Sequence, residues 1–254
     1  GRLHLDLSDY HKAKMVFQSV LEISIQVGDR KSEGVNIGMM GQAHAQMGEY
    51  TEASEAFTSA IQILSEVGDK IYLASFLSAI GVMYKDLNQY ESAIQYVQHS
   101  VDLSLDIGDK RGAARTIGNL ANIYQNLGQL EDAIIQYQKA LCLGREIGDA
   151  KSACINLGNL GNVYQNLGDT EQAIKSFEQA ANIAEELGDK SIEAINRGNL
   201  GVIYVGQNRL AEAIEAMELA VQITREIRDR RNEGVFVGNL GDIFAKSESW
   251  SQAM

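Results

Sequence analysis

The sequence contains no proline, although it is 254 residues long. Because proline removes a helical hydrogen bond and breaks or kinks a helix, its absence is compatible with long, uninterrupted helices along the whole chain. No apolar run approaches the ~20 residues that a membrane-spanning helix needs, and no signal peptide opens the chain. The sequence therefore predicts a protein that has no membrane partner.

Basic residues are also scarce, because 22 lysines and arginines stand against 34 aspartates and glutamates. The net charge is −12 and the pI is about 4.8. Nucleic-acid-binding surfaces usually show clustered lysine and arginine, and the sequence has no such stripe, so we expect no nucleic-acid partner. Hydrophobic residues make up 45% of the chain, which is enough for a buried core and too much for a disordered acidic segment.

The residues of catalytic and metal sites are few and scattered. The four histidines occupy unrelated positions and show no metal-ligand spacing. Cys142 and Cys154 lie on either side of a predicted tight turn; a disulfide fits that spacing, and free thiols in a reducing compartment are the simpler interpretation. The glycines are spread along the chain and do not form a phosphate loop. We therefore expect no catalytic residues, no cofactor and no metal, and a cytoplasmic location.

What the chain has instead is a repeat of 40 residues. The stretch Gly118–Gly128 returns as Gly158–Gly168, and eight of the ten positions from 119 and from 159 agree. Weaker copies in the same register begin at Gly38, Ser78, Gly198 and Gly238. A single register that runs through the chain is the signature of a repeat protein.

Two helix breaks divide each repeat. The first is a Gly-Asp pair such as Gly28-Asp29, in which glycine ends one helix in the left-handed conformation and aspartate caps the next helix. In the last copy, Arg228 takes the place of glycine. A left-handed arginine costs of order 1 kcal/mol, so we expect this turn to be strained or differently wound. A second, looser break lies midway, as at Gly128-Gln129, so each repeat is a pair of helices, A and B.

These breaks predict where the helices lie. We expect A helices over 30–47, 70–87, 110–127, 150–167, 190–207 and 230–246. We expect B helices over 10–27, 50–67, 90–107, 130–147, 170–187 and 210–227. The single domain 1–254 then divides into a half repeat 1–29, full repeats 30–69, 70–109, 110–149, 150–189 and 190–229, and a half repeat 230–254. Residues 1–7 are expected to end a first helix and 249–254 to begin another B helix, so we interpret the chain as a piece of a longer polypeptide.

The expected core residues carry a resemblance to a known family. Helix A has a large, a small and an aromatic residue, and helix B a small, an aromatic and a small residue, at fixed spacings. They are Leu120, Ala121, Tyr124, Ala133, Tyr137 and Ala140, and one repeat later Leu160, Gly161, Tyr164, Ala173, Phe177 and Ala180. This pattern resembles the tetratricopeptide repeat over nearly the full length. The chain departs from the common form in its period of 40 instead of about 34 residues, and in lacking the usual proline at the end of helix B. The long form is similar to the repeats of Pins-type adaptors, kinesin light chains and bacterial sensor or caspase-like (CHAT) proteins.

The resemblance implies an all-α fold, a right-handed superhelical α-solenoid of antiparallel helix pairs. Alanines such as Ala133 are expected to let helix B approach helix A, with an aromatic residue of helix A filling the gap. The aromatic column is expected to be core, and its members are Tyr84, Tyr124, Tyr164 and Tyr204, with His44 and Phe244 as irregular members.

The resemblance further implies that ligands bind on the concave face formed by the A helices. Two columns of residues, three positions apart, share this face and are rich in asparagine. An asparagine amide offers both a donor and an acceptor to the backbone of an extended peptide. The other interpretation is that these asparagines are solvated or bond one another between repeats. The candidate peptide-binding residues are Arg115, Asn119, Asn122, Asn126, Ile155, Asn159, Asn162, Asn166, Ile195, Asn199 and Asn239.

These candidates predict an extended segment bound over residues 110–207. Its backbone would contact the asparagines, an acidic group would contact Arg115, and apolar side chains would contact Ile155 and Ile195. A column before the asparagines is mostly glycine, at Gly38, Ser78, Gly118, Gly158, Gly198 and Gly238. Glycine inside a helix costs about 0.5–1 kcal/mol relative to alanine, so something must approach closely there, either a neighbouring helix or a ligand backbone.

We therefore expect an interaction scaffold or adaptor that binds a protein or peptide. One alternative is a regulatory sensor region of a larger bacterial signalling or caspase-like enzyme. The other is a self-assembling solenoid, because repeat arrays with uncapped ends stack end to end.

Overall fold

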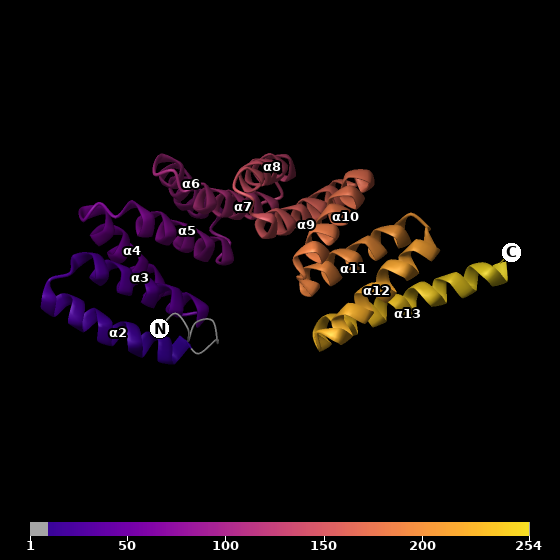
Figure 1. The fold of residues 1–254 in the computed structure, drawn as a ribbon, viewed down its shortest axis with the longest axis horizontal. Coiled ribbons are helices and arrows are strands. Elements are labelled where there is room, and N and C mark those ends of the chain that lie inside the picture. Colours follow the sequence, from indigo (N-terminus) through magenta and orange to yellow (C-terminus); the bar gives the residue numbers. More distant parts are fainter. Residues whose placement is uncertain (1–9, 254) are drawn as a thin grey trace. The chain divides into compact units, whose positions relative to one another are not determined.

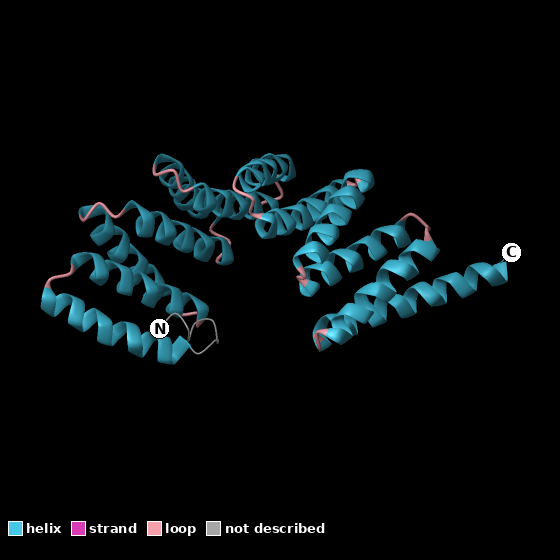
Figure 2. Cartoon of the chain, viewed as in Figure 1, coloured by secondary structure: helices cyan, strands magenta, loops and turns pink. Residues whose placement is uncertain are grey.

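The computed structural model describes residues 10–253, and the side chains of His11 and of 247–253 are left out of that description. These residues form twelve helices and no strand, in the order that Figures 1 and 2 show. The predicted all-α class is thus confirmed. The helix end expected at residues 1–7 lies outside the described residues.

Every predicted helix pair is found. The A helices are α3 (Arg30–Gln46), α5 (Lys70–Asp86), α7 (Lys110–Asn126), α9 (Ala150–Leu167), α11 (Lys190–Gly206) and α13 (Arg230–Ala253). The B helices are α2 (Tyr10–Val27), α4 (Tyr50–Glu66), α6 (Tyr90–Asp106), α8 (Leu130–Glu146), α10 (Thr170–Leu187) and α12 (Leu210–Glu226).

The chain forms two compact units, an N-terminal unit that ends at Leu127 and a C-terminal unit that begins at Gly128. Within each unit a helix packs mainly on its neighbours in sequence, as α3 does on α4 and α9 on α10. Successive A helices are also in contact: α5 contacts α7, and α9 contacts α11. This serial packing of helix pairs is that of an α-solenoid, and it gives each unit an elongated core between its stacked repeats.

Left-handed residues end the helices, as the Gly-Asp pairs predicted. Positive φ angles occur at Gly28, Gly48, Gly68, Gly108, Gly128, Gly148, Gly168 and Gly188, and at three other residues, Asn88, Asn208 and Arg228. Aspartate then caps the following A helix. Asp29 accepts the backbone N–H of Ser32 at 3.0 Å, and Asp229 accepts that of Asn232 at 3.1 Å.

The Arg228 turn has the same winding as the other turns, with φ +60°, so of the two expectations the strained turn is the one found. We predict that Arg228→Gly raises the free energy of unfolding by about 0.5–1 kcal/mol, because glycine adopts this conformation without the Cβ penalty. Urea unfolding followed by circular dichroism measures the change. The reverse substitution at an equivalent turn, Gly188→Arg, should lower stability, and equal stability of all three proteins would show that the turn carries no strain.

The C-terminal end of the array differs from the prediction. α13 continues to Ala253 without a turn, so the expectation that 249–254 begin another B helix is wrong. Glu248 stands where the other repeats have glycine or asparagine, and a left-handed glutamate is costly, so the helix continues. Phe244 is 42% exposed among the described residues, although its column was predicted to be core.

The other core predictions are largely confirmed. The alanine column of the B helices is completely buried, at Ala13, Ala53, Ala93, Ala133, Ala173 and Ala213. In the aromatic column His44 and Tyr204 are buried, whereas Tyr84, Tyr124 and Tyr164 are only half-buried. Tyr84 stacks on Tyr96 with ring centroids 5.5 Å apart, so this column forms the edge of the core instead of its centre.

Candidate functional site

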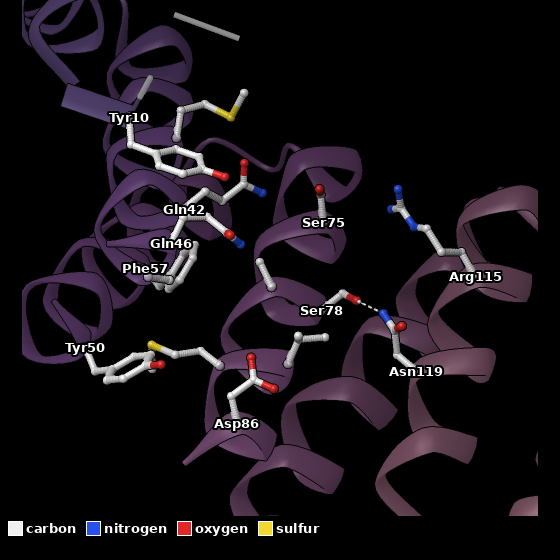
Figure 3. A pocket seen from close by; sticks show the side chains of 15 residues that line it. Tyr10, Gln42, Gln46, Tyr50, Phe57, Ser75, Ser78, Asp86, Arg115 and Asn119 are labelled. Carbon is white, nitrogen blue, oxygen red and sulfur yellow. Dashed lines mark hydrogen bonds between the residues drawn. The ribbon is translucent and has the colours of Figure 1, made fainter. Parts of the chain in front are cut away.

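A groove of about 500 Å³ lies in the N-terminal unit, on the face that its A helices α3, α5 and α7 share (Figure 3). We call it the A-helix groove. Tyr10 of α2 and Tyr50 and Phe57 of α4 contribute to one side. Its lining residues are Tyr10, Met39, Gln42, Ala45, Gln46, Tyr50, Phe57, Ser75, Ser78, Ala79, Val82, Met83, Asp86, Arg115 and Asn119.

Helical spacing explains why these residues meet. Met39 and Gln42 are three residues apart on α3, and Ala79 and Val82 are three apart on α5, so each pair lies on one face of its helix. Since the repeat is 40 residues long, the same face recurs on each A helix. The groove thus brings together members of both columns that the sequence indicated.

The groove combines amides, apolar side chains and one charge of each sign. In Figure 3, Tyr10 and Gln42 point into it from one side and Arg115 points from the other, with Ser75 between them. Asp86 lies toward the opposite end of α5 from Ser75. Such a surface suits a ligand that offers backbone-like polar groups as well as apolar side chains.

Asn119 is partly committed to a structural contact. Its Nδ2 donates to the Ser78 Oγ of the preceding A helix at 3.3 Å, which Figure 3 marks with a dashed line. This is the bonding between repeats that stood as the other interpretation of the asparagines. Asn122 is half-buried and Asn126 exposed on the following turns of α7, and neither lines the groove.

Gln46 and Asp86 stand in the column of the predicted residues Asn126 and Asn166, and sequence reasoning missed these two earlier members of it. These residues lie one helical turn beyond Gln42 and Val82, and the signal that could have found them is the i+4 spacing on the same face. The predicted site instead began at residue 110, so of its members only Arg115 and Asn119 line this groove.

The remaining predicted residues lie in the C-terminal unit, on α9, α11 and α13. Asn159 bonds the hydroxyl group of Tyr137, which is completely buried. That burial raises the pKa of Tyr137 well above its usual range. The exposed or half-buried members are Ile155, Asn162, Asn166, Ile195 and Asn199. Asn239 lines a separate cavity of about 220 Å³ with Val202, Asp242 and Lys246.

The glycine column is explained by the neighbouring helix. A Cβ on Gly38 would lie 2.4 Å from the ring of Phe76, and one on Gly198 would lie 2.3 Å from the ring of Phe236. Each ring belongs to the A helix of the next repeat. The glycines therefore serve helix packing in these repeats. Of the two expectations, the neighbouring helix is the group that approaches them.

The two cysteines are free; Cys142 is exposed and Cys154 is buried. Burial raises the pKa of the Cys154 thiol to about 11, and its Sγ donates to the carbonyl oxygen of Ala180 at 3.0 Å. In the described part of the chain, no three His, Cys, Asp or Glu side chains are arranged to hold a metal ion. None of the helices described is both long and apolar enough to cross a membrane.

Serially packed helix pairs with a groove along the A helices define the chain as an α-solenoid repeat protein. The family model for the tetratricopeptide repeat matches residues 35–106, 72–146 and 151–226. The chain therefore belongs to the tetratricopeptide repeat family.

Solved structures share this fold at low sequence identity. BtubC (BKLC) from P. vanneervenii has a TM-score of 0.77 and 18% identity, with 86% of this chain and 92% of that chain covered. Kinesin light chain TPR-like repeats from Podosopora anserina have a TM-score of 0.62 and 17% identity, over 77% and 95% of the two chains. A Rap protein complexed with competence and sporulation factor has a TM-score of 0.68 and 13% identity, over 96% and 73%. At these identities the similarity establishes the fold alone. No curated protein sequence matches the chain.

Proposed function

We propose that the chain is a protein-interaction scaffold that binds an extended peptide segment of a partner in the A-helix groove. The observation that carries this proposal is the composition of the groove, in which amide side chains flank an apolar strip and Arg115 stands at one side. The structural similarity to a Rap protein that is complexed with a factor is in keeping with a ligand-binding role. The proposal assigns no catalytic step to the chain.

The amides are placed to bind a peptide backbone. Gln42 and Gln46 each offer a donor and an acceptor from α3. On α7, the bond to Ser78 uses the Nδ2 of Asn119 and fixes the orientation of its amide, so its Oδ1 is presented as an acceptor. An amide that is oriented before binding loses less conformational entropy when the ligand arrives.

The apolar and charged residues set the side chains that the ligand would carry. Met39, Ala79 and Val82 form the apolar strip, which suits small or medium apolar anchors. Arg115 is exposed and would bind a carboxylate, as the sequence predicted, and Asp86 would favour a basic group at the other end. The ligand is thus an uncharged or mixed-charge segment with apolar anchors.

The A-helix face of the C-terminal unit is proposed to contact ligands of the same class. Ile155 and Ile195 are 45% and 41% exposed and offer apolar contacts, and Asn162, Asn199 and Asn239 offer amides. Asn159 is better assigned to structure, because its bond to Tyr137 satisfies a hydroxyl group that is buried.

A charge placed in the A-helix groove is predicted to abolish this binding. Peptides selected on the wild-type protein from a displayed random library should lose at least about tenfold in affinity for Val82→Glu, since a buried carboxylate there would be desolvated by the ligand. The matched control is Ile71→Glu, which places the same charge at a 66% exposed position of the same helix. Fluorescence anisotropy measures both affinities. Equal affinity of the two variants for every selected peptide would contradict the proposal.

A further inference from the structure

A second groove lies in the C-terminal unit, between the B helices α8 and α10, with α9 as its floor. It consists of one cavity of about 400 Å³ and another of about 240 Å³, and both are lined by Arg145, Leu157 and Gln179. We call it the B-helix groove. No residue predicted for peptide binding lines it, so it is separate from the proposed site on the A helices.

Its floor is an apolar stripe of α9. Ala153, Leu157, Leu160 and Tyr164 are four, three and four residues apart, so they lie on one face of the helix. Leu157 and Leu160 are each 5% exposed, so only an edge of the floor lines the cavities, and α8 has no side chain at Gly144 beside Ala153 and Leu157. A Cβ on Gly144 would meet only the carbonyl oxygen of Asp149 within 4 Å, at 3.7 Å, so the space beside it is open.

The other five B helices all have a side chain at the position of Gly144. The counterpart of Gly144 in α4 is Leu64, which is completely buried. The counterpart of Leu157 in α11 is Arg197, whose Nη2 bonds the Oε2 of Glu185 on α10 at 3.0 Å. Among the six B helices α8 alone has glycine at this position, so the opening beside Gly144 is specific to this repeat.

Two cations stand on the walls of this groove. Arg145 of α8 and Lys175 of α10 are both exposed, and neither forms an ion pair with the described residues. The one acidic residue in the lining, Asp149, is committed to capping α9, where its Oδ1 accepts the N–H of Ser152 at 3.1 Å. Unpaired cations beside an apolar floor, in a chain of net charge −12, make this surface complementary to an acidic ligand.

We infer that the B-helix groove is a second docking site, which takes a linear segment of a protein partner that carries apolar side chains next to aspartate or glutamate. The apolar side chains contact Leu157 and Leu160, and the carboxylates bond Arg145 and Lys175. Gln138, Gln172 and Gln179 supply amides along the walls for the backbone of the segment. The scaffold then has one docking site in each unit, on A helices in the N-terminal unit and between B helices in the C-terminal unit.

The rate at which Cys142 is labelled reports whether a peptide occupies the B-helix groove. It lines this groove and is exposed, whereas Cys154 is completely buried, so a maleimide reagent labels Cys142 alone. A peptide bound in the B-helix groove covers the thiol and slows its labelling. A peptide bound in the A-helix groove leaves the rate unchanged.

The test uses two pairs of variants of the full chain. Gly144→Leu fills the groove with the residue that α4 has at this position, and Gly144→Ala improves the helix without filling the groove. Lys175→Glu inverts a wall charge, and Lys139→Glu inverts an exposed charge on α8 that does not line the groove. Circular dichroism confirms that each variant is folded.

Displayed short random peptides are selected on the wild-type protein, with excess soluble Gly144→Leu protein as competitor. We expect acidic, apolar peptides that protect Cys142 from maleimide and lose at least about tenfold in affinity for Gly144→Leu and Lys175→Glu. Their affinity for Gly144→Ala and Lys139→Glu should be unchanged. Failure to select any peptide that distinguishes Gly144→Leu would overturn the site. Groove-specific peptides without acidic residues would overturn the ligand class. Val82→Glu leaves these results unchanged, so the two proposals fail independently.

Discussion

Replacing Phe177 with alanine is expected to remove about 3–5 kcal/mol from the free energy of unfolding of the C-terminal unit. Phe177 lies on α10, is completely buried, and belongs to a core cluster that includes Ala194, Leu200 and Met217. Its removal leaves a cavity that the surrounding helices cannot close without losing their contacts with each other. Since repeats contact only their neighbours, the loss should be greatest in α9, α10 and α11. Urea unfolding measures its size, and amide hydrogen exchange locates it.

A second substitution on the facing helix separates this cavity from a general loss of hydrophobicity. Gly161 of α9 faces the Phe177 ring, and a Cβ there would lie 2.7 Å from the ring carbon Cε1. Gly161→Ala should therefore destabilise the wild-type protein. In the Phe177→Ala background the same methyl group enters the cavity and the helix gains about 0.5–1 kcal/mol, so the effect should become stabilising. If Gly161→Ala has the same sign in both backgrounds, the ring does not pack against the backbone of α9.

The helices could be predicted from the sequence because their ends are encoded locally. A glycine that tolerates the left-handed conformation and an aspartate that caps the next helix act within a few residues of each other. The prediction failed only at 249–254, where Glu248 replaces the residue that would reverse the chain. The same local rule could have predicted this continuation of the helix, because position 248 has neither the glycine nor the asparagine that the other repeats have there.

The site could be predicted only in part, because it depends on which side chains meet across helices. The face of the A helices followed from the 40-residue register and from helical spacing. The partners of its asparagines did not, since Asn119 bonds Ser78 from the preceding repeat and Asn159 bonds Tyr137. The B-helix groove was also beyond sequence reasoning. It arises from a missing side chain at Gly144, and the absence of a side chain gives no periodic signal.

Glycines in one register of the A helices differ in what an added Cβ would contact among the described residues. Gly38 and Gly198 each face a phenylalanine of the next A helix, and a Cβ on either would come within 2.4 Å of a ring carbon. Gly238 occupies the same place on α13, yet no heavy atom of the described structure lies within 4 Å of a Cβ there. Among the described residues, Gly238 therefore lacks the contact that Gly38 and Gly198 make.

We predict that alanine at these glycines changes stability in opposite directions. Gly38→Ala should lower the free energy of unfolding by about 1–3 kcal/mol, because Phe76 is 1% exposed and its ring is held beside Phe57 and Tyr72. Gly238→Ala should raise it by about 0.5–1 kcal/mol, since only the helical preference of alanine acts there. Urea unfolding of both variants gives the comparison, and Phe76→Leu should relieve part of the Gly38→Ala loss by shortening the opposing side chain. A loss of stability of equal size at Gly38 and Gly238 would mean that the A helix itself requires glycine at this position, whatever packs against it. Opposite signs would assign Gly38 to the contact between successive repeats.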